Sequence, residues 1–218
     1  MTDEVNRQRR SLRLQGYDYA QAGAYFVTLC TQGRECLFGE IMDGKMLLND
    51  AGRMVNEEWH ALPQRFPTVE LDAFVVMPNH VHGIIVIASS GNNPAPVGAG
   101  LVPARNGATT RVAPTLGDRV APTLGDMVGA FKSRVTVKYV HGVKSNGWLS
   151  CHGRVWQRNY YEHIIRDEAS LHRIREYIVN NPLQWALDRE NPANVGTGLV
   201  PARNGATTRV APTAWEDT

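Results

Sequence analysis

Apolar residues recur along this chain with two periods, and these periods separate the expected strands from the expected helices. Runs rich in β-branched residues indicate strands at 24–32, 69–77, 81–88 and 155–167, with a turn and a short strand at 37–50. Helical spacing of apolar residues indicates helices at 49–62, 125–140 and 168–182. The last helix is expected to end at Pro182, because proline interrupts helical hydrogen bonding.

The order of these elements predicts an α+β fold. A strand, a helix, two strands, a helix, a strand and a helix follow one another, and the tight turn "MPN" joins the strands at 69–77 and 81–88. A small antiparallel sheet with helices on one face fits this order. The helix at 125–140 has an apolar side that includes Phe131, and the basic residues Lys132 and Arg134 lie away from that side.

Two repeated stretches interrupt the pattern. The segment "GLVPARNGATTRVAPT" occurs at 100–115 and, letter for letter, at 198–213, and "RVAPTLGD" occurs in tandem at 111–118 and 119–126. Neither has a helical or strand period, and identity at every position indicates translated copies of a repeated DNA element; a duplicated binding loop is the alternative. The expected organisation is a basic arm at 1–14, a folded domain at 15–189 with an insertion at 93–124, and a disordered tail at 190–218.

Composition and charge narrow the class of protein. At 218 residues the chain can bury one good core, and a net charge of +2 does not by itself indicate a nucleic-acid partner. The amino-terminal arm nevertheless concentrates four arginines of the kind that contact phosphates, with a solvated terminus as the alternative: Arg7, Arg9, Arg10 and Arg13. No signal segment or membrane-spanning run is visible, and the three cysteines have no metal or disulfide spacing, which predicts a cytoplasmic protein with reduced thiols.

The stretch "VVMPNHVHGIIVI" at 75–87 places two histidines in an apolar strand. Positions i and i+2 of a strand face the same side, so His80 and His82 are expected side by side, with Val81 pointing into a core on the other face. Two adjacent imidazoles are half of a metal site. A buried pair that is hydrogen-bonded to the backbone is the alternative.

The last predicted helix carries a second candidate pair. Tyr177 and Asn181 are four residues apart in "REYIVNN" and therefore share one helix face. An amide oxygen and two imidazoles make a mixed N/N/O ligand set, which leaves positions on a hard divalent ion for water and phosphate oxygens. A phenol beside such an ion is a candidate nucleophile, and simple core packing of Tyr177 is the alternative.

These motifs together resemble a known family. The "HVH" at 80–82 looks like the HUH motif (His-hydrophobic-His) of single-strand DNA endonucleases. The combination of "MPNHVHGIIVI", "VGAFKS", "WQRNYYEHIIRDE" and "YIVNNP" resembles the REP-associated tyrosine transposases, and "RRSLRLQGYDYAQAGAYFVTLCT" is similar to their amino-terminal segment. The resemblance covers roughly 9–92 and 125–187 and leaves out both repeated stretches.

The resemblance implies a fold, a reaction and a set of roles. The fold would be a ferredoxin-like (RRM-like) antiparallel sheet with helices packed on it. His80 and His82 would bind Mg²⁺ or Mn²⁺, Tyr177 would be the nucleophile, and Asn181 would be the third ligand, where related transposases have glutamine. The protein would cut single-stranded DNA beside hairpins of repetitive palindromes and rejoin it through a 5′-phosphotyrosine link, as a monomer or a homodimer.

Further residues are expected to contact DNA. The phosphate backbone would be held by the basic residues Arg7, Arg9, Arg10, Arg13, Lys132 and Arg134. Unstacked bases would stack on Trp156, Tyr160 and Tyr161, of which at least one is expected to pack in the core instead. The two tyrosines are also rival nucleophiles, but they lack a ligand at helical spacing.

Two other functions stay open on the sequence. One is a non-catalytic nucleic-acid binder damaged by the insertion, because the duplicated "TLGD" gives two competing starts for the following helix. The other is a zinc hydrolase that uses the histidine pair, although no third histidine or cysteine has a convincing spacing.

Overall fold

The structure, a computed structural model, describes residues 17–88 and 121–194. The predicted basic arm, most of the predicted insertion and both copies of the longer repeat lie outside the described residues. Within the described ranges, no helix combines the length and the apolar character that crossing a membrane requires.

Four strands form one antiparallel sheet in the order β4-β5-β1-β6. Their bounds are Gly23–Cys30 (β1), Val69–Val76 (β4), His80–Ile87 (β5) and Tyr161–Ile165 (β6). One helix-containing connection joins β1 to β4 and another joins β5 to β6, which is the arrangement of a ferredoxin-like fold. The predicted α+β class and antiparallel sheet are therefore confirmed.

The remaining elements surround this sheet. A separate hairpin of β2 (Gly39–Met42) and β3 (Lys45–Leu48) replaces the single short strand predicted within 37–50. The helices are α1 (Asp50–His60), α2 (Leu62–Arg65), α3 (Leu124–Ser145) and α4 (Glu168–Asn180). Short 3₁₀ turns are η1 (Gln32–Arg34), η2 (Asn181–Leu187) and η3 (Pro192–Asn194).

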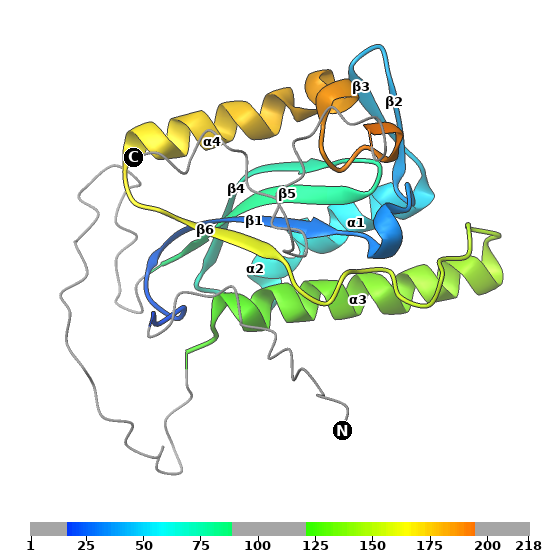
Figure 1. The fold of residues 1–218 in the computed structure, drawn as a ribbon. Helices are drawn as coiled ribbons and strands as arrows, with labels where there is room; N and C mark the ends of the chain where they lie inside the picture. The colour runs from blue at the N-terminus through cyan, green and yellow to red at the C-terminus, as the bar shows by residue number, and fades with distance from the viewer. Residues whose placement is uncertain (1–16, 89–120, 195–218) are drawn as a thin grey trace, which may run out of the picture.

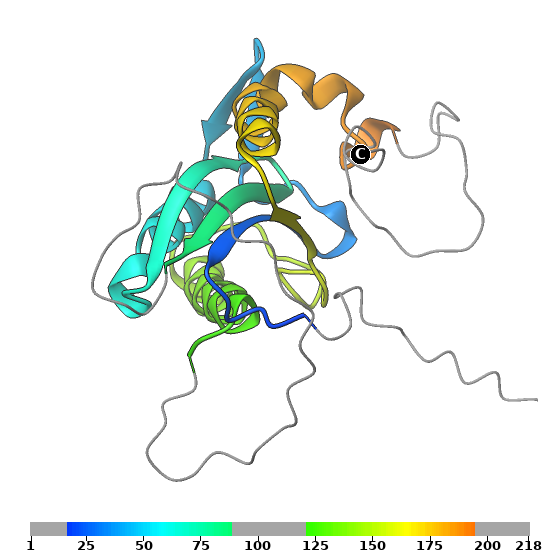
Figure 2. The same ribbon diagram turned by 90° about the vertical axis from the view of Figure 1, so that its left-hand side faces the viewer.

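Helices cover both faces of the sheet (Figures 1 and 2). The helices α1 and α3 lie on one face, and α4 lies on the other. The prediction of helices on one face was wrong in this respect, because the central strand β1 is apolar on both sides. Its residues Tyr25 and Val27 belong to the core beneath α1 and α3, whereas Phe26 belongs to the smaller core beneath α4.

The folded residues extend past two predicted boundaries. The helix α3 begins at the fully buried Leu124, inside the predicted insertion. The Thr123 side chain accepts a hydrogen bond from the Asp126 backbone N–H, and the Asp126 carboxylate accepts one from the Thr123 backbone N–H, so the second copy of "TLGD" supplies a capping box. At the other end Glu190 is only 1% exposed, although it follows the predicted domain end at 189.

The strand predicted at 155–167 is shorter in the structure. Only Tyr161–Ile165 pairs in the sheet as β6. Before it, Trp156 forms an isolated bridge with Thr31 and is buried against the rings of Phe38 and Phe131. The apolar residues of this segment therefore reflect core packing rather than continuous strand pairing.

Candidate active site

The strand β5 brings the two predicted histidines together. His80 Nε2 and His82 Nε2 are 3.0 Å apart, and both side chains are buried. Val81 belongs to the core beneath α1 and α3, whereas the His82 ring lies against Phe26 in the core beneath α4. The two-residue period of the strand thus places both imidazoles on one face of the sheet, as predicted.

Asn79 fixes the orientation and the tautomer of His80. Its Nδ2 donates hydrogen bonds to the carbonyl oxygens of Arg34 and Glu190, at 3.0 and 2.6 Å, so its Oδ1 faces His80 Nδ1 at 2.8 Å. Because a carboxamide oxygen only accepts, the proton of the neutral ring is assigned to Nδ1, and His80 Nε2 presents a lone pair. Thr28 Oγ1 orients the second ring through His82 Nδ1 at 2.8 Å.

Burial keeps both imidazoles uncharged. Loss of hydration lowers the pKa of His80 to about 4 and also lowers the pKa of His82 well below its usual value, with neighbouring His80 contributing to the second shift. At neutral pH both rings are therefore neutral, which is the form that can donate a nitrogen lone pair to a metal ion.

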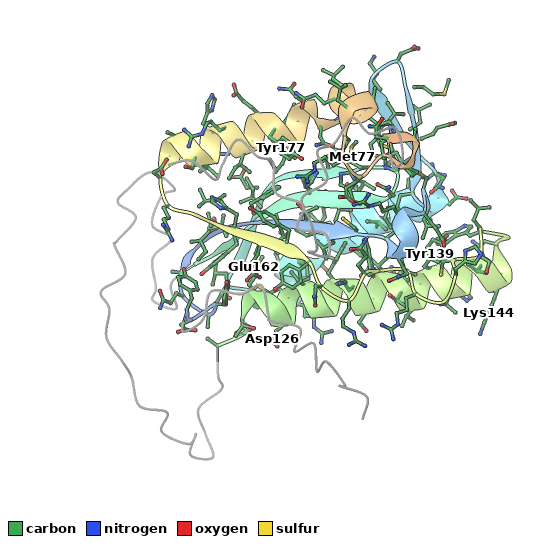
Figure 3. All side chains as sticks on the ribbon, in the orientation of Figure 1. Met77, Asp126, Tyr139, Lys144, Glu162 and Tyr177 are labelled. Atoms are coloured by element: carbon green, nitrogen blue, oxygen red, sulfur yellow. The ribbon has the colours of Figure 1, made fainter. Side chains whose placement is uncertain are left out.

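The helix α4 presents Tyr177 to the histidines. The side chain lies on the sheet side of α4 (Figure 3), with its Oη 3.3 Å from His82 Nε2. Arg175, two residues earlier, forms a bidentate ion pair with Asp72 of β4, which fixes the helix over the sheet. Burial raises the pKa of the Tyr177 phenol, and the charge of Asp188 adds to this, so the hydroxyl is protonated at neutral pH.

Asn181 completes the set of residues predicted from the sequence. It follows the last residue of α4, is 2% exposed, and interacts through its carboxamide with both His80 and Tyr177. Its Oδ1 is buried and has no hydrogen-bond partner among the residues that the structure describes. An unsatisfied amide oxygen in a buried site is costly unless a cation or water binds it, so this atom and the two imidazoles fit a divalent ion.

The carboxylate of Asp188, which was not predicted from the sequence as a site residue, also lies beside the two histidines. Asp188 Oδ2 lies 3.7 Å from His80 Nε2, and ligand atoms of His80, His82 and Asp188 all lie within 4.8 Å of one another. Asp188 lies beyond Pro182, where the helical period has ended, so no spacing connected it to Tyr177. The one available signal was an acidic residue soon after the helix.

Most of the predicted DNA contacts lie elsewhere or have other partners. The four arginines of the arm, Arg7, Arg9, Arg10 and Arg13, lie outside the described residues. Lys132 donates from Nζ to the Gln157 carbonyl oxygen at 2.6 Å, and Arg134 pairs with buried Glu58. Trp156 and Tyr160 pack on the core beneath α1 and α3.

The rival nucleophile Tyr161 lies on the same face as the histidines but across a strand. Thr28 of β1 pairs with His82 on one side and with Tyr161 on the other. Two strand spacings, about 10 Å, therefore separate the backbones of Tyr161 and His82. Tyr177, rather than Tyr161, therefore lies beside the imidazole pair.

Comparison with known sequences finds a similar protein. No protein-family model matches the chain. An uncharacterized protein of Haemophilus influenzae is 42% identical over 199 residues, which cover 87% of this chain and 98% of that protein.

Two solved structures are also similar to this chain. A REP-associated tyrosine transposase bound to a REP hairpin aligns with a TM-score of 0.50 and 16% identity, over 92% of this chain and 100% of that one. A candidate transposase from Deinococcus radiodurans aligns with a TM-score of 0.39 and 18% identity, over 77% of this chain and 95% of that one. The chain therefore belongs to the same family as the Haemophilus influenzae protein, and it shares the fold of a REP-associated tyrosine transposase.

Proposed function

We propose that this protein is a metal-dependent transposase that cuts and rejoins single-stranded DNA beside hairpins of repetitive palindromes. The fold shared with a transposase bound to a REP hairpin supports this proposal. The observation that carries it is the meeting of three side chains: the His80 and His82 Nε2 atoms lie 3.0 Å apart, and the Tyr177 hydroxyl lies 3.3 Å from His82 Nε2. A nucleophile and the ligands of an electrophilic ion thus share one buried point.

The reaction is a transesterification at phosphorus. The Tyr177 Oη attacks the scissile phosphate and loses its proton to water, while the bond from phosphorus to the 3′ oxygen breaks and that oxygen takes up a proton. The products are a 5′-phosphotyrosyl link and a free 3′ hydroxyl. Because the link replaces one phosphodiester with another, a hydroxyl from a second strand can reverse the step without ATP.

The residues around Tyr177 prepare this chemistry. His80, His82 and the Asn181 Oδ1 would hold Mg²⁺ or Mn²⁺, which when bound polarises a phosphate oxygen and offsets developing charge. The Phe26 ring packs edge-on against the phenol, and the buried His82 ring lies beside it, so neighbouring rings orient the hydroxyl. The bidentate pair of Arg175 and Asp72 keeps the phenol in place while the strand is exchanged.

A denaturing gel tests the proposal. The protein is incubated with a hairpin-bearing single strand and Mg²⁺ or Mn²⁺, and a protein–DNA adduct that survives denaturant is the expected product. Tyr177→Phe should remove the adduct, whereas Tyr161→Phe, which changes a tyrosine on the same face, should retain it.

Other outcomes identify the competing functions. Hairpin binding without an adduct would indicate a non-catalytic nucleic-acid binder. Zinc-dependent hydrolysis of another substrate would indicate a hydrolase, for which two histidines and a carboxylate are also a suitable ligand set. An adduct that persists in Tyr177→Phe would assign the nucleophile elsewhere.

A further inference from the structure

The chain that follows α4 does not leave the site but turns back across it. The 3₁₀ turn η2 begins at Asn181, and the residues after it return to the histidines, where Asp188 meets His80 and Glu190 is buried. We infer that Asp188 is a carboxylate ligand of the divalent ion and that residues 181–194 form a cover that holds it there. This inference rests on the proposed function and adds an anionic ligand to it.

The spacing of the donor atoms suits a single ion. Ligand atoms at right angles on an ion with bonds of about 2.1 Å lie about 3.0 Å apart, and opposite ligands lie about 4.2 Å apart. The two histidine nitrogens are 3.0 Å apart, Asp188 Oδ2 is 3.7 Å from His80 Nε2, and the whole group lies within 4.8 Å. Small adjustments of the Asp188 side chain would bring all three atoms onto one coordination sphere.

The tautomer of His80 supports a cation between this ring and the Asp188 carboxylate. Asn79 assigns the ring proton to Nδ1, so Nε2 faces Asp188 Oδ2 with a lone pair. Two electron-rich atoms that face each other in a buried site repel, and a cation bound between them would remove this repulsion. Asn181 Oδ1, which has no hydrogen-bond partner within 17–88 and 121–194, is a third electron-rich atom that a bound cation would satisfy.

Asp188 is held in this orientation by its own neighbours. The Glu190 backbone N–H donates to Asp188 Oδ1 at 2.7 Å, which leaves Oδ2 turned toward His80. Asn194 Nδ2 donates to the Asp188 carbonyl oxygen at 2.9 Å. The carboxylate therefore sits in a tight turn whose geometry is fixed on both sides.

Glu190 anchors the cover to the rest of the fold. Its carboxylate, 1% exposed, accepts a hydrogen bond from Arg34 Nη2 at 3.3 Å and forms an ion pair with Arg34 Nε at 3.0 Å. Its carbonyl oxygen accepts from Asn79 Nδ2, the same carboxamide that orients His80. One asparagine thus links the position of the cover to the orientation of a metal ligand, so both are set together.

Calorimetric titration of the full chain with Mn²⁺, without DNA, tests this assignment. We expect Asp188→Asn to weaken Mn²⁺ binding at least about tenfold. Arg34→Gln keeps every metal-ligand atom but removes the ion pair that holds Glu190, and it should weaken Mn²⁺ binding about tenfold. Asp43→Asn is the matched control: it removes one carboxylate at an exposed turn with φ of 50°, which asparagine accepts, and should bind as the parent does.

A second measurement covers the case in which Asp188→Asn is poorly folded. Asp188→Glu keeps the charge but shifts the oxygen atoms by one methylene, and the water-proton relaxivity of bound Mn²⁺ should rise in it as water replaces the lost carboxylate. Parent-like affinity and relaxivity in the Asp188 variants would overturn the inference. If His80→Ala also binds Mn²⁺ like the parent, the metal site of the proposed function fails as well, so the two failures are distinguishable.

Discussion

The ion pair between Arg175 and Asp72 fixes the helix that carries Tyr177, and its contribution to stability can be estimated. Arg175 Nη2 and Nε donate to the two carboxylate oxygens at 2.6 and 2.9 Å, and the side chains are 36% and 19% exposed. Charge-assisted bidentate pairs stabilise a fold more than ordinary surface ion pairs do, but partial exposure of the two side chains to water reduces this stabilisation. We expect Asp72→Asn to lower the free energy of unfolding by about 1–2 kcal/mol at pH 7.

The pH dependence of this loss has a definite sign. The hydrogen bonds from Arg175 lower the pKa of the Asp72 carboxyl in the folded protein relative to the unfolded chain. A lowered pKa adds stability above the unfolded value of about 3.9, and this stability disappears as the pH falls through the folded pKa. The difference between Asp72→Asn and the parent should therefore be full at pH 7 and should shrink as the pH falls through the folded pKa.

Urea unfolding of a double-mutant cycle measures the pair directly. Asp72→Asn, Arg175→Met and the double variant should give a coupling free energy of about 1 kcal/mol or more at pH 7. The exposed pair of Asp50 and Arg53, with side chains 59–65% exposed, is the matched control, and Asp50→Asn should cost about 0.5 kcal/mol or less. Additive single effects, or an Asp72→Asn loss that is unchanged in acid, would refute the reasoning.

Three further changes have defined outcomes. Gly83→Ala would place a methyl group 2.3 Å from the buried Trp59 ring, and urea unfolding should show a loss of about 2–3 kcal/mol; a loss near zero would mean that the ring yields. Thr123→Ala removes the capping box of α3 and should cost about 1 kcal/mol in thermal melts, and an unchanged melt would argue against this cap. Asn79→Ala should weaken Mn²⁺ binding about tenfold by calorimetry, and unaltered affinity would argue against its control of His80.

The parts of this site that were predictable are those set by local geometry. His80 and His82 share a face because a strand alternates, and Tyr177 and Asn181 share a face because a helix repeats every 3.6 residues. That the two pairs meet follows from packing α4 on the face of the sheet opposite α1 and α3, and periodicity alone does not choose that face. The resemblance to a known family supplied that link.

The residues that were missed depend on contacts between distant parts of the chain. Asp188 and Glu190 follow the proline that ends the helix, in the segment between η2 and η3, which has no apolar period, and the bond from Asn79 to Glu190 spans 111 positions. The backbone contacts of Lys132 were not predictable for another reason. A helical wheel places its Cα away from the core, but its long side chain folds back to reach backbone carbonyl oxygens before β6.

The capping box of α3 has a consequence for how this gene can change. Thr123 and Asp126 both belong to the second unit of the tandem "RVAPTLGD", and the first unit ends immediately before it. Removing one unit, or adding more, would leave the same eight letters directly before the rest of the helix. Slippage of the coding sequence by whole units would therefore alter the length of the protein while each resulting allele still starts this helix at the same threonine.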